Sequence, residues 1–179
     1  AQVLSALRKA LDRGELRLVF QPRMALSDGR ITGVEALLRW HCPELGDIPP
    51  TTFIPLAEES GLILQIGVWV LQEACQTLRR WRNHGLTEVS MAVNVSVLQL
   101  LRGKLPELLR RIIATTGVPA DRIELEVTES MVMQNAEQTT AALNALREIG
   151  VSLAIDDFGT GYSSLAYLKR LPIDTLKID

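Results

Sequence analysis

Short runs in which apolar and polar residues alternate are separated along this chain by longer stretches in which apolar residues recur at helical spacing. The alternating runs predict strands at residues 16–24, 31–40, 89–95, 123–128, 151–157 and 175–178. The helical spacing predicts helices at residues 1–12, 53–60, 62–83, 105–116, 136–149 and 162–171. From residue 31 onward, strand and helix take turns, and this order favours a parallel sheet with helical crossovers.

Turn-forming residues mark the boundaries between these elements. The prolines and Gly46 within residues 41–50 predict a loop. Asn135 with Gln138 resembles a capping box for the helix at 136–149, and Gly150 is a suitable C-terminal stop for it.

Five polar residues stand on the polar parity of five different strands, near the strand exits. They are Glu35, Asn94, Glu126, Asp156 and Lys177. Ligand sites in parallel α/β folds lie at the carboxyl ends of the strands, in open sheets and in barrels alike. We therefore expect these side chains to converge on one site.

The chemistry of this set favours a hard cation. Carboxylate and amide oxygens suit magnesium, manganese or calcium, whereas zinc prefers histidine or cysteine. Asp156 and Asp157 are adjacent, so the acids suffice for two ions, which at roughly 4 Å separation can bridge a phosphate and activate a water. Lys177 adds a positive charge that can position this water. Phosphodiester hydrolysis suits these parts.

Each signal taken alone also has an ordinary structural explanation. The two aspartates can form a turn and cap the next helix. Glu35 can pair with Arg39 on its own strand, and Asn94 can be a satisfied polar group. Lys177 can be a simple ion-pair partner, and Glu129 can anchor a loop.

Composition limits the remaining possibilities. The chain has 179 residues, 47% apolar side chains, a net charge of −2 and a mean hydropathy of +0.14, which indicates one soluble domain and gives no reason to expect a nucleic-acid polymer as partner. Cys42 and Cys75 lack metal-binding spacing and fit a reducing, cytoplasmic setting. No apolar run reaches the about 18 residues that span a bilayer, so any membrane tether would come from other domains. His41 and His84 are interpreted as surface residues.

The sequence also resembles a known family. Glu35 to Trp40 reads EALLRW, which is similar to the signature of the EAL domain family, bacterial phosphodiesterases of cyclic di-GMP. Further segments resemble family blocks in family order: residues 21–22, 53–58, 94–96, 126–130, 156–164 and 176–179. The resemblance covers almost the whole chain after the first helix.

The resemblance implies a role for each candidate residue. Glu35, Asn94, Glu126 and Asp156 would ligate one magnesium or manganese ion, and Asp156 and Asp157 would serve a second. Glu35 and Lys177 would be catalytic, with Lys177 contacting the catalytic water or the metal site.

Substrate binding and assembly are implied in the same way. Gln21, Leu37 and Arg39 would hold the dinucleotide, with Arg39 reaching a phosphate. Glu129 would steady the loop from Phe158 to Ser164, which in this family couples dimerisation to metal and substrate binding.

The resemblance further implies a TIM-like (β/α) barrel whose first strand is antiparallel to the others. Such a barrel needs about 250 residues, so we expect residues 1–179 to be a single domain that lacks its last two β/α units. Two segments depart from the family pattern, His41-Cys42-Pro43 and Arg23-Met24, where a more apolar pair is usual. We expect neither to touch a metal position.

The expected function is hydrolysis of cyclic di-GMP to linear pGpG, in a homodimer whose parent protein also carries sensor or GGDEF-type domains. A catalytically inactive cyclic di-GMP receptor and a purely structural dimerising module are the alternatives.

Overall fold

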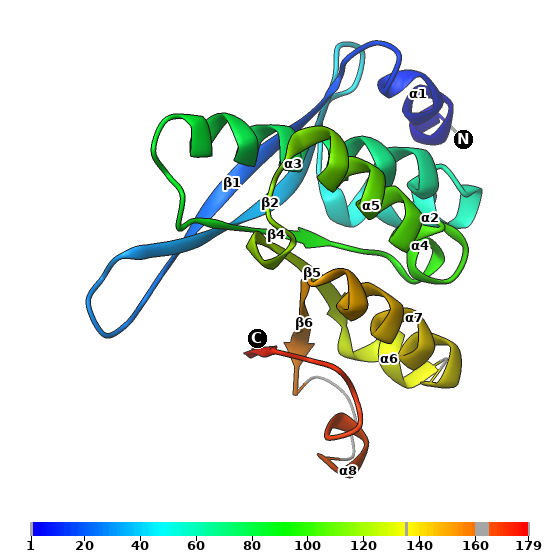
Figure 1. Cartoon of the computed structure of the whole chain (residues 1–179). Helices are drawn as coiled ribbons and strands as arrows, with labels where there is room; N and C mark the ends of the chain where they lie inside the picture. The colour runs from blue at the N-terminus through cyan, green and yellow to red at the C-terminus, as the bar shows by residue number, and fades with distance from the viewer. Residues whose placement is uncertain (1, 135, 160–164, 179) are drawn as a thin grey trace.

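The computed structural model describes residues 2–134, 136–159 and 165–178 (Figure 1). Its helices are α1 (Gln2–Ala10), α2 (Pro50–Ser60), α3 (Ile63–Asn83), α4 (Val97–Arg102), α5 (Leu105–Thr116), α6 (Glu129–Gln134), α7 (Ala136–Ile149) and α8 (Leu165–Leu168), with a short 3₁₀ turn at Ala120–Arg122. Its strands are β1 (Leu16–Met24), β2 (Ile31–Cys42), β3 (Gly46–Ile48), β4 (Ser90–Asn94), β5 (Ile123–Thr128), β6 (Ser152–Phe158) and β7 (Thr175–Ile178).

The strands form one sheet in the order β1-β2-β4-β5-β6-β7, with β3 paired to β2. The strand β1 runs antiparallel to β2, and each step from β2 to β7 is parallel. Helices connect the parallel strands, as parallel pairing requires. The expected alternation of strand and helix, with an antiparallel first strand, is thus confirmed.

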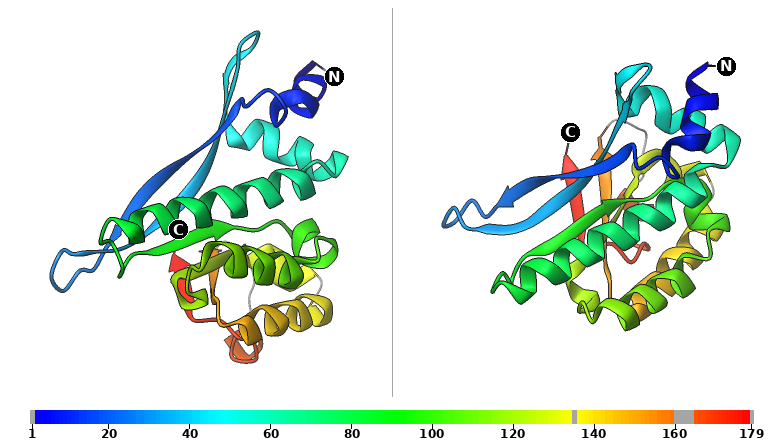
Figure 2. Two further views of the ribbon diagram at one scale, coloured as in Figure 1. Left: turned by 45° about the horizontal axis from the view of Figure 1, so that its top comes forward. Right: turned by 90° about the horizontal axis from the view of Figure 1, so that it is seen from above.

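The sheet is strongly curved. Lys177 on β7 and Glu35 on β2 lie four strand intervals apart, which in a flat sheet would separate their backbones by about 19 Å. Their side-chain atoms Nζ and Oε2 nevertheless lie 3.2 Å apart. The sheet therefore curls around a concave face, and α3, α5 and α7 lie along its outer side (Figure 2).

Alternation within the strands separates the two faces. Residues of one parity are buried in the hydrophobic core under the helices: Met91, Val93, Ile123, Leu125, Val127, Leu153 and Ile155. The other parity faces the concave side, where Ala92 and Ala154 are small and flank Glu124 and Glu126 in the strand register. Small neighbours leave room on this face for long polar side chains.

The expected loop at residues 41–50 is wrong over most of its length, because residues 41–48 form the end of a β-hairpin. The strand β2 continues to Cys42, and β3 returns beside it, so that Trp40 pairs with Ile48 and Cys42 with Gly46. Gly46 takes a left-handed backbone (φ 76°), which permits the tight turn. The hairpin pairs backbone groups next to the buried Cys42 and Ile48.

Two short helices were not expected. Helix α4 begins at a capping box, in which Ser96 Oγ accepts from the Gln99 amide and the Gln99 side chain accepts from the Ser96 amide, both at 3.1 Å. Helix α6 follows β5 directly. The predicted cap at Asn135 lies outside the described residues, as does the first part of the predicted helix at 162–171.

Within residues 2–134, 136–159 and 165–178, no helix has the length and hydropathy of a membrane span. His41 and His84 are exposed, as expected, although His41 lies on β2 and not in a loop.

The two cysteines provide a test of the packing. Cys42 and Cys75 are unpaired and fully buried, and burial raises the pKa of the Cys75 thiol to about 12. The raised pKa leaves almost no Cys75 thiolate at pH 8, and burial shields both thiols from solvent, so we expect neither cysteine to react with a thiol-specific reagent in the native protein. Both should react after unfolding in guanidinium chloride. Rapid labelling of the native protein would contradict this packing.

Candidate functional site

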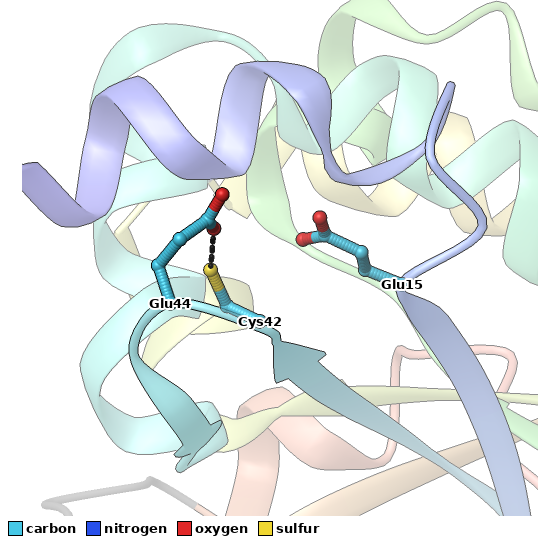
Figure 3. A group of neighbouring side chains, drawn as sticks. All are labelled: Glu15, Cys42 and Glu44. Atoms are coloured by element: carbon cyan, nitrogen blue, oxygen red, sulfur yellow. Dashed lines mark hydrogen bonds between the residues drawn. The ribbon is translucent and has the colours of Figure 1, made fainter.

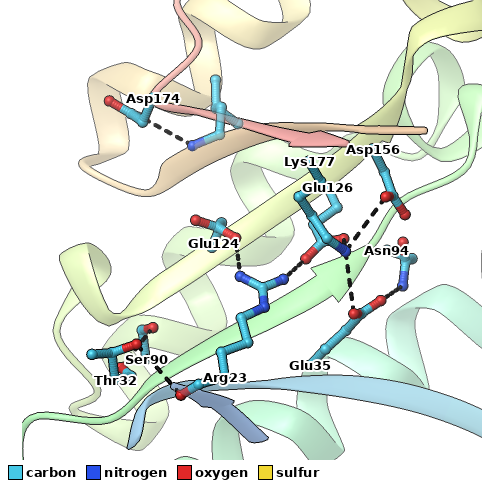
Figure 4. Close-up of polar contacts among 11 residues, drawn as sticks. Arg23, Thr32, Glu35, Ser90, Asn94, Glu124, Glu126, Asp156, Asp174 and Lys177 are labelled. Carbon is cyan, nitrogen blue, oxygen red and sulfur yellow. Dashed lines mark hydrogen bonds and ion pairs between the residues drawn. The ribbon is translucent and has the colours of Figure 1, made fainter. Parts of the chain in front are cut away.

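Four charged side chains from four strands meet on the concave face (Figure 4). Lys177 Nζ lies 2.6 Å from Glu126 Oε2, 3.2 Å from Glu35 Oε2 and 3.5 Å from Asp156 Oδ1. From β4, Asn94 Nδ2 donates a hydrogen bond of 2.9 Å to Glu35 Oε1. The structure thus brings together all five residues that the sequence placed at strand exits.

The three carboxylates, Glu35, Glu126 and Asp156, form what we call the acidic cluster. Each contributes an oxygen atom, and these atoms lie within 4.8 Å of one another. The Glu126 side chain is fully buried, while those of Glu35 and Asp156 are 15% and 25% exposed. Buried carboxylates at this separation repel one another unless a cation compensates their charge.

The charge balance leaves room for one divalent ion. Counted over the groups that are joined by ion pairs, the carboxylates of Glu35, Glu124, Glu126 and Asp156 stand against the two cations Arg23 and Lys177. The formal sum is −2. Carboxylate and amide oxygens are the ligands that magnesium and manganese prefer, so the donor set fits such an ion.

The expectation that Arg23 touches no metal position is wrong. Arg23 on β1 donates from Nη2 to Glu126 Oε1, and its Nη1 lies 2.6 Å from Glu124 Oε1. In the β1–β2 register Arg23 stands opposite Gly33. One signal in the sequence was that Arg23 and Gln21 stand on the same face of their strand. The partner strand β5 lies about a hundred residues further along the chain, so the contact itself could not be predicted from this local pattern.

Asp157 stands apart from the acidic cluster. Its backbone is left-handed (φ 55°), and its amide donates to Asp156 Oδ1 at 2.9 Å. Its side chain is exposed, and the residue lines the adjoining cavity. The structure therefore brings Asp157 to the edge of the site, without placing it among the oxygens of the acidic cluster.

A cavity of about 700 Å³ adjoins the acidic cluster, within the size range of small-molecule sites. Leu37 and Arg39 line it, as do Glu126 and Asp156. Gln21 is opposite Glu35 in the β1–β2 register. All three predicted substrate-binding residues thus lie near the cluster.

The hydrogen bonds of Arg39 and Glu35 test the ordinary structural explanation of Glu35 as the partner of Arg39. Arg39 Nη1 donates to the Leu38 carbonyl, whereas Glu35 bonds Asn94 and Lys177, so the structure does not form the Glu35–Arg39 pair considered from the sequence. Glu58 also lines the cavity, and burial raises the pKa of its carboxyl.

Glu129 begins α6 and is buried. Its Oε2 accepts a 3.0 Å hydrogen bond from the Gly159 amide, just after β6. Gly159 has a left-handed backbone (φ 99°), which favours glycine. Glu129 thereby holds the start of the predicted loop at 158–164, whose residues 160–164 lie outside the described part of the chain.

A second acidic group lies between the start of β1 and the end of β2, formed by Glu15, Cys42 and Glu44 (Figure 3). Arg13 pairs with both acids, at 3.6 Å to Glu15 and 3.4 Å to Glu44, and Trp40 donates to the other oxygen of Glu15 at 2.9 Å. The Cys42 thiol donates to Glu44 and lowers the pKa of that carboxyl. A protein cation, Arg13, thus pairs with both acids of this group and links the segment before β1 to the turn after β2.

Comparisons with known proteins agree with the fold. The family model of the EAL domain matches residues 4–179. The bifunctional diguanylate cyclase/cyclic di-GMP phosphodiesterase MucR and the cyclic di-GMP phosphodiesterase NbdA, both of Pseudomonas aeruginosa, are each 48% identical to this chain over 99% of its length. The chain covers only 26% and 23% of those proteins, about a quarter of their length.

A solved structure of the PaMucR phosphodiesterase in complex with c-di-GMP superimposes on the whole chain with a TM-score of 0.96 and 47% identity, and the chain covers 72% of it. The curved sheet with an antiparallel first strand is the TIM-like barrel arrangement that the sequence predicted. A match over nearly the whole chain, together with this structural agreement, shows that the chain belongs to the EAL domain family.

Proposed function

We propose that this chain is the hydrolytic domain of a signalling phosphodiesterase that opens cyclic di-GMP to linear pGpG. The observation that carries the proposal is the acidic cluster, joined by Lys177 at 2.6–3.5 Å and open to a cavity of about 700 Å³. The similarity to MucR and NbdA, both named for cyclic di-GMP phosphodiesterase activity, supports the choice of substrate.

In this proposal Glu35, Asn94, Glu126 and Asp156 would hold one magnesium or manganese ion, and Asp156 with Asp157 would hold a second. The ions supply a water of lowered pKa and neutralise phosphate charge when bound. The support is the oxygen-only donor set and the uncompensated formal charge on the concave face.

The chain's own residues then bind and orient the reactants. Arg39 on the cavity wall binds a phosphate through its forked donors, and Leu37 and Gln21 contact the nucleotide. Lys177 Nζ, held by Glu35 and Glu126, donates to the attacking water and fixes its position. Glu35 keeps the Lys177 ammonium aimed into the site.

The reaction adds one water across one phosphodiester. The water oxygen bonds to phosphorus, the bond from phosphorus to the 3′ oxygen breaks, and that oxygen gains a proton. The product is a linear dinucleotide with a 5′ phosphate and a free 3′ hydroxyl. Positive charge at Lys177 and Arg39 favours the transition state, in which negative charge accumulates on the phosphoryl oxygens.

The whole-protein part of the proposal rests on the family. We propose a homodimer formed through the region 158–164, whose start is held by the hydrogen bond from Gly159 to Glu129, and a cytoplasmic domain attached to sensor or GGDEF-type domains. An inactive cyclic di-GMP receptor is the rival. The complete set of acids with Lys177 favours the enzyme, because a receptor needs the cavity but not the cluster.

The first prediction concerns turnover. Glu35→Ala and Asp156→Ala should each abolish cyclic di-GMP hydrolysis in the presence of Mn²⁺ while leaving the protein folded, because removing a carboxylate from a crowded cluster relieves repulsion. The matched control is Glu59→Ala, an exposed glutamate on α2, which should keep full activity.

The assay is chromatographic detection of pGpG, run on the 179-residue chain and on the longest natural polypeptide that contains it. Turnover by either variant would refute the assigned ligands. Tight nucleotide binding without turnover by the unaltered longest polypeptide would favour the receptor.

The second prediction concerns stability. Lys177→Met should lower the free energy of unfolding of the metal-free protein by roughly 1–3 kcal/mol, because it leaves the buried Glu126 carboxylate without one of its charged partners. Added Mn²⁺ should raise the melting temperature of this variant more than that of the parent, since the ion replaces the lost charge. Lys169→Met, at an exposed position, should behave as the parent. Equal melting shifts in all three proteins would contradict a cation site here.

A further inference from the structure

We propose that Arg23 is a positioning residue for Glu126: it holds one oxygen of this carboxylate so that the other is presented to the acidic cluster. The inference deepens the proposed function and rests on it. It assigns a role in the site to a position on β1 that the sequence had placed outside it.

Glu126 is held from both sides. Its Oε1 accepts from Arg23 Nη2, and its Oε2 accepts from Lys177 Nζ at 2.6 Å, while the side chain has no exposed surface. The terminal torsion of a glutamate is soft, so an unrestrained carboxylate can rotate and exchange its two oxygens. Arg23 removes this freedom and leaves Oε2 as the oxygen that faces Lys177.

Arg23 is itself fixed by a second acid. Its Nη1 lies 2.6 Å from Glu124 Oε1, so the planar guanidinium bridges two glutamates that stand two residues apart on the same face of β5. Opposite Arg23, Gly33 lies so close to Ser90 that an added Cβ would come within 2.5 Å of the serine Oγ. The glycine therefore permits the close approach of β2 to β4 at this level of the sheet. A lysine would have to bring one nitrogen within reach of both carboxylates, whereas the planar guanidinium offers each acid its own nitrogen at a fixed separation.

The ion pair with Glu124 neutralises the positive charge that Arg23 brings next to Glu126. An isolated arginine beside Glu126 would repel a divalent ion, but the Glu124 carboxylate cancels this charge at short range. Arg23 does not line the cavity, so it should affect the metal ligand without contacting the nucleotide.

Four variants separate positioning from charge. Arg23→Met removes the positive charge and the hydrogen bonds to Glu124 and Glu126. Arg23→Lys keeps the charge but not the two separate nitrogen donors of the guanidinium. The double variant Arg23→Met/Glu124→Gln restores the net charge of the concave face without restoring the contact to Glu126. The matched control is Arg30→Met, which removes an exposed arginine, paired with Asp28, at the β1–β2 turn.

Two readouts are measured on the longest natural polypeptide that contains this chain: the dissociation constant for Mn²⁺ by calorimetry without nucleotide, and kcat and KM for cyclic di-GMP. Loss of a residue that orients a metal ligand typically costs 10–100-fold in affinity or activity. We expect Arg23→Lys and the double variant to lose 10–100-fold in kcat and in Mn²⁺ affinity with an unchanged KM, and Arg30→Met to match the parent.

Full recovery in the double variant would overturn the proposal, because it would show that only charge matters. Parent-like Mn²⁺ affinity and kcat in Arg23→Lys would overturn it as well. Folding of each variant is checked by near-ultraviolet circular dichroism. If Arg23→Met does not fold, the comparison of Arg23→Lys with the parent decides the outcome, because Arg23→Lys conserves the charge. Absence of hydrolysis by the parent would refute the proposed function, while the Mn²⁺ affinities would still decide the role of Arg23.

Discussion

The structure depends on how the buried charge of Glu126 is compensated. Its side chain is fully buried at the centre of the concave face, and an isolated carboxylate in such a place would cost several kcal/mol. Lys177 from β7 and Arg23 from β1 supply the compensation from the two ends of the sheet. The 3.2 Å contact from Lys177 to Glu35, four strand intervals away, requires the sheet to curl, so the charge pairing and the barrel-like curvature support each other.

The same arrangement explains why the two faces of the sheet differ so sharply. The outer parity of the strands is aliphatic and packs against α3, α5 and α7, whereas the inner parity combines small residues with charged ones. Ala92 and Ala154 are the register neighbours of Glu124 and Glu126, and their small side chains leave space for these long ones. A larger residue in place of either alanine would compete with the site for volume.

Much of this could be predicted from the sequence, and the misses have physical causes. The bounds of β1, β5 and β7 agree with the prediction because their alternation is regular. The acidic cluster was found because residues at strand exits of a parallel sheet must meet. The hairpin at β3 was missed because glycine and proline in residues 41–50 are equally typical of a loop. The Arg23–Glu126 contact was missed because it depends on curvature, which no local pattern reports.

The central claim is that the acidic cluster is a divalent cation site. The most direct test is a crystal of the protein grown with Mn²⁺ and measured near the manganese absorption edge. The account predicts an anomalous peak within bonding distance of Glu35, Glu126 and Asp156, at about 2.0–2.2 Å from their oxygens. A peak at the second acidic group of Glu15, Cys42 and Glu44 instead, or none on the concave face, would contradict it.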